Sequence, residues 1–596
     1  MTATAPSAPG KGPGLPALPT VNAVLRTAAA SPYALTFLDA QERETALTWT
    51  RVLERAQAAA AALASLGVRH GDRVAIVIPT SPAFVDAFFG VLLAGAVPVP
   101  LYPPVRLGRM DEYHRATARM LSRVGAELVV SDARVRLLLG QAVAEARPPL
   151  GLVIAEELQG AVPVEMEDPR PEDLALIQFS SGSTVDPKPV ALEHRHLVAQ
   201  CAALQSLMPE PASSGALGVS WLPLYHDMGL IGALLSAAYY PGPLVLIPPE
   251  VFLGQPAIWL RAISRFRGTI SPAPNFAYAL CLKRVSQREL EGVDLRSWRY
   301  ALNGAEPVSP EVLRRFSERY GPLGFDPASL MPVYGLSEAS LAVTFSPRRS
   351  PAKTVSVDPR ALAERSRAEA GTYELASVGR PVPGVEVEIR GQDGRALPER
   401  RVGRVWVRGP SVMRGYFEDE GATRAALPGG WLDTGDLGFL AEGELYLCGR
   451  EKDLVIIRGA NHAPQEFEVC LEGVPGVRPG CAVALGFTPE GGTSEELLIL
   501  AERRGDASLD AAVEEAVRRA VVERTGIRPH TVKMLEPGTL PRTSSGKMRR
   551  REALRRFQAG QLTPPLRMGV MRFAAEVARS TLALARSRLK RSREGR

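Results

Sequence analysis

The sequence predicts an α/β protein: a large N-terminal domain of helix-covered sheets with a small β-rich subdomain, then a small mobile α+β C-terminal domain. Three observations support this. Apolar runs alternate with helical stretches from about residue 47, the helical spacing stops near Ser377, and a compact αβ segment begins near Gly449. At 596 residues the chain is also too long for one hydrophobic core.

Helices and strands alternate in the first part of the chain. The Ala-rich stretch 49–66 is typical of a helix, which Gly67 ends. Strands are expected at 73–79, 97–102 and 128–131, and helices at 82–94 and 112–124. Strands that alternate with such helices form parallel sheets, which bind ligands at the carboxyl ends of their strands.

The later segments differ in character. Residues 378–407 are rich in Val and Gly and alternate clearly at 385–389, which predicts small antiparallel strands. The expected domains are a flexible leader at 1–20, an N-terminal domain at 21–448 with its β-rich subdomain at about 377–448, a mobile C-terminal domain at 449–558 and a basic tail at 559–596.

Composition excludes several classes of protein. The chain is 45% hydrophobic and 23% charged, which is typical of a soluble globular protein. No apolar run is long enough to cross a bilayer, and the Ala/Pro/Gly-rich start lacks the layout of a signal peptide. The five cysteines have neither metal-ligand nor redox spacing. A cytoplasmic location is therefore expected.

The net charge of +7 belongs to the tail. Residues 567–596 hold nine Lys/Arg and two Asp/Glu, while the remaining chain is neutral, which argues against nucleic-acid binding by the main body. Two stripes recur at helical spacing: Arg572, Arg579, Arg586 and Arg593, and separately Val570, Phe573, Val577 and Leu584. A solvated or disordered tail is the leading expectation. The alternative that the two stripes suggest is an amphipathic basic helix that contacts an anionic membrane surface or an acidic carrier protein.

One loop is rich in groups that hold phosphates. Residues 180–190 read Ser-Ser-Gly-Ser-Thr-Val-Asp-Pro-Lys-Pro-Val and directly follow the apolar run 174–179, which is typical of a buried strand. This loop is therefore expected at the carboxyl end of a strand in a parallel sheet, where ligands bind. Hydroxyls, backbone N–H groups and one lysine suit the phosphates of a nucleotide. Because the spacing of the common phosphate-binding loop is absent, a polar surface turn is the alternative for this loop taken alone.

Six further segments follow at intervals along the chain. They are 221–229 (Trp-Leu-Pro-Leu-Tyr-His-Asp-Met-Gly), 302–307 (Leu-Asn-Gly-Ala-Glu-Pro), 333–338 (Val-Tyr-Gly-Leu-Ser-Glu), 431–436 (Trp-Leu-Asp-Thr-Gly-Asp), 449–453 (Gly-Arg-Glu-Lys-Asp) and 540–547 (Leu-Pro-Arg-Thr-Ser-Ser-Gly-Lys). With the Ser-rich loop, they resemble the adenylate-forming superfamily over about residues 21–557. The resemblance implies that a carboxylate attacks the α-phosphate of ATP, pyrophosphate leaves and an acyl-adenylate forms.

The resemblance also implies which residues bind ATP and Mg²⁺. The pyrophosphate loop would comprise Ser180, Ser181, Gly182, Ser183, Thr184 and Lys188. The adenine pocket would comprise Asn303, Gly304, Ala305 and Glu306, with Tyr334 stacking on the base beside Gly335. Glu338 resembles the magnesium ligand, because this ion prefers oxygen donors.

A second group of residues resembles the catalytic and ribose-binding set. Lys547 resembles the lysine that bridges the attacking carboxylate and the α-phosphate, whose like charges repel, and it would act with Glu338 and His226. Asp436 resembles the carboxylate that accepts both ribose hydroxyls, and Arg450 its cationic neighbour. Lys452 lies where relatives have the hinge between the two domains.

Among the branches of this superfamily, the chain is most similar to the fatty acyl-AMP ligases. The similarity lies in 221–229, 248–250, 271–276 and the long stretch between Glu338 and Val378. In that branch the stretch is thought to restrict domain rotation and exclude coenzyme A, so an acyl carrier protein would accept the acyl group. The alternatives are a fatty acyl-CoA ligase and a non-catalytic acyl-binding or scaffold protein. The last is kept because Val185 and Pro189 replace glycines that relatives commonly have in the phosphate loop.

Overall fold

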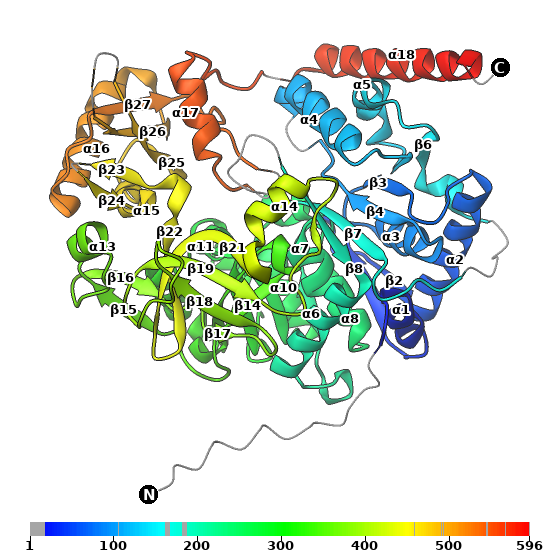
Figure 1. The fold of residues 1–596 in the computed structure, drawn as a ribbon, viewed down its shortest axis with the longest axis horizontal. Helices are drawn as coiled ribbons and strands as arrows, with labels where there is room; N and C mark the ends of the chain where they lie inside the picture. Colours follow the sequence, from blue (N-terminus) through cyan, green and yellow to red (C-terminus); the bar gives the residue numbers. More distant parts are fainter. Residues whose placement is uncertain are drawn as a thin grey trace, which may run out of the picture.

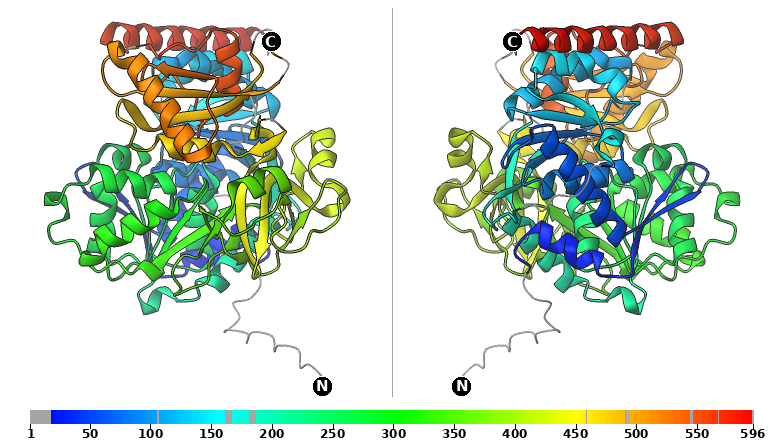
Figure 2. Two further views of the ribbon diagram at one scale, coloured as in Figure 1. Left: turned by 90° about the vertical axis from the view of Figure 1, so that its left-hand side faces the viewer. Right: turned by 90° about the vertical axis from the view of Figure 1, so that its right-hand side faces the viewer.

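The molecule is built from several sheets with helices packed around them (Figure 1). The computed structural model describes residues 18–104, 107–160, 167–180, 187–457, 459–489, 492, 494–543, 546–566 and 568–594. Within these residues, a large N-terminal part is followed by a smaller αβ part, coloured orange, that lies against it (Figures 1 and 2). The predicted α/β fold class is confirmed.

A parallel sheet forms where the alternating pattern predicts it. Its described strands lie in the order β4 (Val97–Pro100), β3 (Arg73–Val77), β5 (Leu128–Ser131) and β6 (Gly151–Ile154). Helices α2 (Trp49–Ser65) and α3 (Pro82–Leu93) pack on one face, and α4 (Met110–Arg123) and α5 (Arg136–Ala146) on the other. Successive residues of β3 point to opposite faces, since Val74 joins the first core and Ala75 the second.

The largest sheet of the described chain lies beneath several of the motif segments. Its strands follow the order β17 (Arg380–Pro381), β14 (Ala342–Phe345), β13 (Leu330–Gly335), β12 (Tyr300–Gly304), β11 (Ile270–Pro274), β9 (Gly218–Ser220), β10 (Leu244–Leu246), β1 (Ala34–Leu38) and β2 (Glu44–Thr48). Strands β13, β12, β11 and β9 run parallel. Their carboxyl ends therefore meet at one edge of the sheet.

Helices cover this sheet and bury a large aromatic cluster. The covering helices include α6 (His194–Leu207), α10 (Ala257–Phe266), α11 (Asn275–Arg284) and α12 (Pro310–Tyr320). Trp259, Tyr278 and Phe316 are fully buried, and the ring centroids of Trp259 and Tyr278 are 5.4 Å apart. This rigid layer supports the strand ends from which the motif loops extend.

The strand before the Ser-rich loop belongs to an antiparallel sheet. β7 (Leu174–Phe179) coincides with the predicted strand, but it pairs antiparallel with β8 (Pro189–Glu193), which pairs with β20 (Gly415–Tyr416). Residues 180–188 therefore connect a β-hairpin, whereas the sequence analysis expected a loop at the end of a parallel strand. An apolar run indicates a buried strand but does not reveal the direction of its partner.

The Val/Gly-rich region forms antiparallel strands, as predicted. β18 (Glu386–Arg390), β19 (Gly403–Arg408), β21 (Leu432–Ala441) and β22 (Glu444–Arg450) pair in that order. The alternating stretch 385–389 falls mainly in β18, where Ile389 is buried in the main core. Asp436 in the middle of β21 contacts Tyr334 on β13 and pairs with Arg450 at the end of β22, so this part of the antiparallel sheet lies beside the carboxyl end of β13.

The αβ segment after β22 has its own core. Strands β25 (Val477–Phe487), β26 (Glu496–Arg503) and β27 (Thr531–Leu535) form a sheet, accompanied by α15 (Pro464–Glu468), α16 (Asp510–Thr525), α17 (Arg550–Gln558) and the hairpin β23 (Val455–Ile457) and β24 (Ala460–His462). Arg556 of α17 lies 2.8 Å from Glu112 of α4. Arg109 also donates to the backbone oxygen of Thr563 at 2.8 Å. These contacts join the segment to the N-terminal part.

The basic tail forms a helix, α18 (Val570–Glu594), that packs on α5 (Figure 2). The backbone N–H of Gly140 donates to Ser580 Oγ at 2.7 Å, and the Gln141 amide donates to Glu576 at 2.8 Å. Val577 and Leu584, two members of the predicted apolar stripe, pack against the α4–α5 core. Part of the predicted apolar stripe is therefore buried against the chain's own core. Among the described helices, none is both long and apolar enough to cross a membrane.

We predict that Gly140→Ala detaches α18 from α5. A Cβ atom at Gly140 would lie 1.9 Å from the backbone oxygen of Ser580, too close for the two helices to keep their spacing. Hydrogen–deuterium exchange of residues 570–587 should accelerate in this variant. Gly254→Ala is the control, because a Cβ there meets no atom within 4 Å. Unchanged exchange in Gly140→Ala would show that this contact is not needed for docking.

Candidate active site

The motif segments converge at the carboxyl ends of neighbouring parallel strands. The segment with His226 follows β9, the one with Asn303 to Glu306 ends β12, and the one with Tyr334 to Glu338 ends β13. The turn after β12 places Ala305 at φ 67°, a left-handed conformation that non-glycine residues rarely adopt. Parallel pairing thus gathers residues that are far apart in the sequence.

The phenol of Tyr334 and the guanidinium of Arg450 both bind Asp436. The Tyr334 hydroxyl donates to Asp436 Oδ2 at 2.6 Å, and Arg450 Nε donates to Oδ1 at 2.6 Å. Burial, together with the Asp436 charge, raises the pKa of Tyr334 well above its usual value, so the phenol keeps the proton that it donates. The Asp436 charge in turn raises the pKa of Arg450. Each Asp436 oxygen keeps a lone pair for a further donor.

A second buried carboxylate organises the loop after β9. Asp227 accepts from Ser337 Oγ at 2.6 Å and from the backbone N–H of Met228 at 2.7 Å, and its Oδ1 lies 2.5 Å from His226 Nδ1. Burial alone would raise the pKa of Asp227, but His226, Ser337 and Lys547 together hold it well below its usual range. Since Nδ1 faces Asp227, the other ring nitrogen of His226 is left for a substrate.

Lys547 enters this group of charges from the small αβ segment. Two contacts with Thr543 hold it: the Lys547 backbone N–H donates to Thr543 Oγ1 at 3.0 Å, and the Thr543 N–H donates to the Lys547 carbonyl at 2.8 Å. Burial lowers the pKa of the Lys547 amine. Arg450 lowers it further, whereas the charges of Asp227, Glu306 and Asp436 raise it. The amine therefore lies within the electrostatic field of charges from four of the other motif segments.

Glu338 follows Ser337 in the loop after β13. It is linked through Tyr416 on β20 to β8, the strand that follows the Ser-rich loop. The Tyr416 hydroxyl donates to Glu338 Oε1 at 3.0 Å, and Lys188 Nζ lies 4.5 Å from the centroid of the Tyr416 ring. Burial, with repulsion from Asp227, raises the pKa of Glu338. A nearby cation would relieve this cost.

Glu338 would bind a metal ion as a single carboxylate ligand. Among the described residues, no group of three or more His, Cys, Asp or Glu side chains is arranged to hold a metal. Mg²⁺ in nucleotide enzymes is commonly held by one or two carboxylates together with substrate phosphates. Glu338 therefore fits Mg²⁺ that arrives with a nucleotide.

The predicted adenine-pocket residues lie where β12 ends. Asn303 is fully buried, and its amide nitrogen donates to Asn275 Oδ1 at 3.2 Å. Asn303 Oδ1 is buried and has no hydrogen-bond partner among the described residues. Glu306 accepts from the backbone N–H of Phe276 at 2.5 Å, and its pKa is raised by burial. Gly304 and Gly335 each pack against neighbouring backbone.

Part of the Ser-rich loop lies outside the described residues, namely Ser181, Gly182, Ser183, Thr184 and also Val185. The two described ends face each other, because the Ser180 N–H donates to the Lys188 carbonyl at 2.9 Å. Pro189, the second departure from the glycine pattern, begins β8 and is buried. As a proline it donates no N–H, and its carbonyl accepts from Phe417 N–H at 2.8 Å.

The predicted hinge residue Lys452 is exposed and lies just beyond Arg450. Its carbonyl accepts a long contact of 3.5 Å from Arg551 of α17. It therefore lies on the surface, next to α17 of the small αβ segment.

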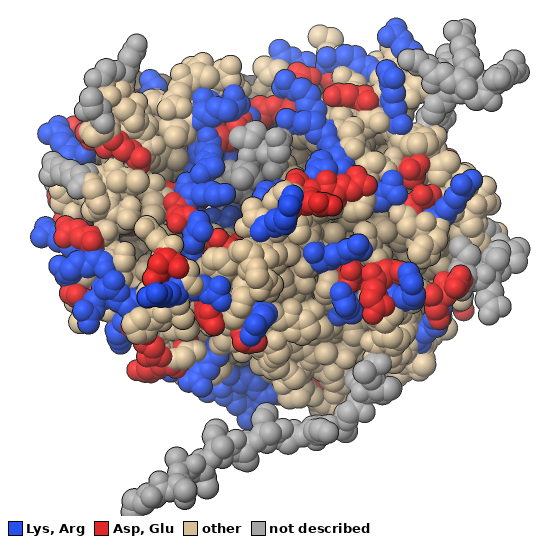
Figure 3. All heavy atoms as spheres, in the orientation of Figure 1, with Lys and Arg blue, Asp and Glu red and all other residues tan. Residues whose placement is uncertain are grey.

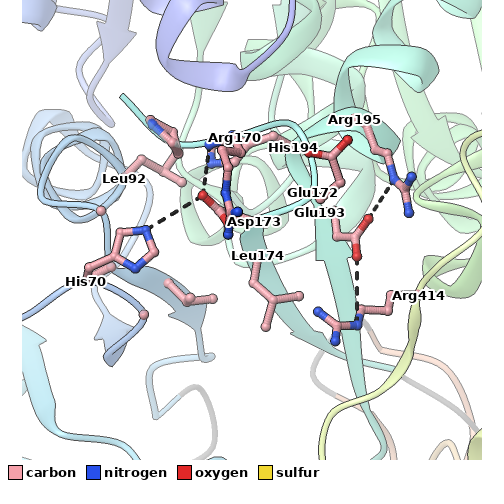
Figure 4. Close-up of a pocket in the computed structure, with 15 residues that line it drawn as sticks. His70, Leu92, Arg170, Glu172, Asp173, Leu174, Glu193, His194, Arg195 and Arg414 are labelled. Atoms are coloured by element: carbon pink, nitrogen blue, oxygen red, sulfur yellow. Dashed lines mark hydrogen bonds and ion pairs between the residues drawn. The ribbon is translucent and has the colours of Figure 1, made fainter. Parts of the chain in front are cut away.

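A separate hollow of about 640 Å³ lies between the parallel sheet and α6 (Figure 4). Its cations are matched by carboxylates: Asp173 lies 3.1 Å from Arg170 and Glu193 lies 2.6 Å from Arg195. None of the predicted site residues lines it. Because its charges are balanced, the hollow does not indicate a charged ligand.

Comparison with known proteins agrees with this geometry. The profile of the AMP-binding enzyme family matches residues 25–417. A Caulobacter vibrioides protein described as an acyl-CoA synthetase is 35% identical over 86% of this chain and 91% of its own. The medium-chain fatty acid–acyl carrier protein ligase JamA of Moorena producens is 32% identical, over 89% and 93%.

A solved structure shares the fold over almost the whole chain. It comes from work on fatty acyl-adenylate ligases of E. coli and L. pneumophila, with a TM-score of 0.85, 35% identity and coverage of 91% of this chain and 98% of the other. This chain belongs to the AMP-binding enzyme family. Its likeness to fatty acyl-adenylate ligases extends through both the large N-terminal part and the small C-terminal part.

Two residues of the site were missed by the sequence analysis. Asp227 lies next to His226 in the motif 221–229, and Tyr416 lies on β20, outside every motif segment. Adjacency to His226 was a usable signal for Asp227, but only the turn after β9 turns its carboxylate inward. For Tyr416 there was no signal, because its contact with Glu338 joins two distant strands.

We predict that Asp227→Asn narrows the pH range of activity at its alkaline end. Asparagine keeps the shape but removes the negative charge that raises the Lys547 pKa, so this pKa falls further. If the ammonium form is required, activity is present below this pKa and is lost as the pH rises through it. The alkaline limb of the rate profile for adenylate formation should therefore move to lower pH.

Ser337→Ala is the control for this experiment. It removes a hydrogen bond to Asp227 but leaves the carboxylate charge in place. Its rate profile should keep the alkaline limb close to that of the unaltered protein. An equal shift in both variants would show that Asp227 acts through local packing rather than through its charge.

Proposed function

We propose that this chain uses ATP and Mg²⁺ to activate a fatty acid as an acyl-adenylate and then passes the acyl group to the phosphopantetheine thiol of an acyl carrier protein. The observation that carries the proposal is the position of the Lys547 amine among the charges of Asp227, Glu306 and Asp436. Membership of the AMP-binding enzyme family and the likeness to fatty acyl-adenylate ligases support it.

The described residues suit the parts of ATP. Asn303 Oδ1, a buried acceptor with no partner among the described residues, suits the exocyclic amine of adenine. Asp436 still accepts hydrogen bonds and suits the ribose hydroxyls, with Arg450 fixing its orientation. Ser180 and Lys188 frame the Ser-rich loop proposed to hold pyrophosphate. Lys188 is also close to the Tyr416 ring that binds Glu338.

Two anions must meet in the first reaction. A carboxylate oxygen of the acid forms a bond to the α-phosphorus, and the bond from that phosphorus to the pyrophosphate oxygen breaks, so pyrophosphate carries away the electron pair. Two unit charges 4 Å apart repel by about 4 kcal/mol at an effective dielectric constant of 20. The Lys547 ammonium would lower this repulsion, and bound Mg²⁺, held by Glu338, would neutralise phosphate charge.

His226 would orient the acid. Its Nδ1 faces Asp227 at 2.5 Å, which leaves Nε2 to contact the carboxylate of the substrate. In the second reaction, the thiol gives up its proton to water, its sulfur forms a bond to the acyl carbon, the bond from that carbon to the adenylate oxygen breaks, and AMP leaves with that electron pair. We propose that the 449–558 domain swings about Lys452 between the two steps, which would withdraw Lys547 and admit the thiol.

The stretch after Glu338 favours a carrier protein, rather than coenzyme A, as the acceptor of the acyl group. β15 (Thr354–Val357), α13 (Pro359–Arg365) and β16 (Tyr373–Ala376) form a small unit beside the antiparallel sheet. Helix α13 packs against β24 of the small domain, and Tyr373 lies close enough to Glu466 and Cys470 for their charges to affect its pKa, which burial raises. A unit held between the two domains would restrict their rotation and so disfavour coenzyme A.

A fatty acyl-CoA ligase is the second candidate. It is favoured by the description of the Caulobacter vibrioides relative as an acyl-CoA synthetase. The carrier protein ligase JamA supports the first candidate at a similar identity. The two candidates share the adenylate step and differ only in which thiol attacks.

We predict that Lys547→Ala lowers the rate of adenylate formation at least about a hundredfold, because the transition state loses its bridging cation. The measurement is fatty-acid-dependent exchange of labelled pyrophosphate into ATP. Lys533→Ala, which changes an exposed lysine on β27, is the matched control and should keep the full rate. No exchange with any fatty acid in the unaltered protein would instead favour a non-catalytic acyl-binding or scaffold protein.

We predict that the unaltered protein acylates a carrier protein but turns coenzyme A over slowly, and that replacing residues 359–370 by a short Gly-Ser linker raises acyl-CoA formation. The linker removes α13 and with it the contact to β24. Acyl-adenylate, acyl-CoA and acylated carrier protein are quantified separately. Unchanged adenylate formation in the linker variant shows that it is folded. Rapid acyl-CoA formation by the unaltered protein would establish the second candidate.

A further inference from the structure

Helix α18 and the residues just before it carry an unusual amount of exposed apolar surface. Five of the twelve large apolar side chains that are exposed in the described chain lie in one short stretch: Leu566, Val570, Met571, Phe573 and Leu582. Val570 and Met571 are each 87% exposed, and Leu582 is 56% exposed. The apolar stripe predicted from the sequence is divided, since Val570 and Phe573 are exposed at the start of the helix, whereas Val577 and Leu584 pack inward on the α4–α5 core.

The outward apolar positions follow the turn of the helix. Met571, Ala575, Ala578, Leu582 and Ala585 are all exposed and are spaced alternately four and three residues apart. That spacing places them along one face of an α-helix. With 25 residues, α18 is roughly 37 Å long, so the face is an extended ridge on the outside of the molecule (Figure 2).

The charge on this ridge has one sign. Among the described side chains of α18, the only carboxylate is Glu576, whose side chain is 3% exposed and is bound by Gln141 and Arg579. The Arg579 side chain remains 61% exposed, and Arg572 and Arg586 are also exposed. Lys and Arg side chains gather along the edge of the molecule that α18 forms (Figure 3). The outward face therefore offers apolar groups flanked by arginines and no exposed carboxylate in its described part.

We propose that the outward face of α18 binds the surface of a membrane that contains anionic lipids. A helix that lies along a membrane inserts its apolar side chains among the lipids and places its arginines at their phosphates. The inward contacts of Ser580 and Glu576 hold the helix on the protein while its outer ridge stays available.

Charge complementarity favours lipid over the other occupants. A second copy of this chain would bring arginines against arginines with no exposed carboxylate from α18 to balance them. A convex ridge also fits a flat, deformable lipid surface better than a partner that would need a matching groove. This inference concerns the outer surface alone and does not depend on which acid or thiol the active site accepts.

The test is co-sedimentation of the full chain with vesicles of phosphatidylcholine alone or of phosphatidylcholine mixed with phosphatidylserine. Binding to the anionic vesicles is expected, and it should weaken as salt is added. The double variant Met571→Glu, Leu582→Glu should bind at least about tenfold more weakly. It replaces two apolar side chains that would insert among the lipids by negative charges that the anionic lipids repel. Leu253→Glu, Leu509→Glu is the matched control, because both leucines are exposed elsewhere.

The control variant should bind like the unaltered protein. Unchanged hydrogen exchange of α18 in the double variant shows that the helix is still docked, so weaker binding then reports on the outer face itself. The proposal fails if the unaltered protein does not bind anionic vesicles at low salt, or if the double variant binds as well as the control. It also fails if the double variant instead abolishes a dimer seen by light scattering, or abolishes binding to an acidic carrier protein with no effect on vesicles.

Discussion

The structure depends on holding opposite charges together where water is largely excluded. The Lys547 amine lies in the field of Asp227, Glu306 and Asp436, and Arg450 lies beside them. Burial lowers the pKa of the amine and by itself would raise the pKa of Asp227, whereas each of these two charges favours the ionised form of the other. These charges therefore stabilise one another across the two parts of the chain. The proposed domain movement would assemble or dismantle this arrangement.

Hydrogen-bonded networks, rather than single residues, fix the positions of these charges. Asp436 joins β13 to β22 through Tyr334 and Arg450, and Asp227 joins the loop after β9 to the loop after β13 through Ser337. Both carboxylates therefore link neighbouring elements at the carboxyl ends of the strands. The aromatic layer behind the sheet leaves these elements little freedom to shift, because a close-packed core resists small displacements.

Several contacts join the small domain to the N-terminal part and would restrict its movement. Arg556 and Glu112 pair across the two parts, the unit containing α13 packs against β24, and the chain leaving α17 continues into α18, which is docked on α5. The small domain is thus attached to the N-terminal part on both sides of its sequence. The Arg556–Glu112 pair and the docking of α18 on α5 would both resist the rotation proposed about Lys452. Activation and transfer would then be balanced by these contacts as much as by the active-site residues.

The sequence alone determined the α/β class, the strands and helices of the first sheet and the motif segments, because these follow from the period of apolar residues and from local residue patterns. It also placed His226, Lys547, Tyr334 and Asp436 in one group through a family resemblance. Tertiary structure decided the rest: that β7 pairs antiparallel, that Asp227 and Tyr416 join the site, and that Val577 and Leu584 of the tail face inward. Strand direction, cross-strand contacts and the occupied face of a helix depend on which distant segments meet, and a local pattern carries no record of its partner.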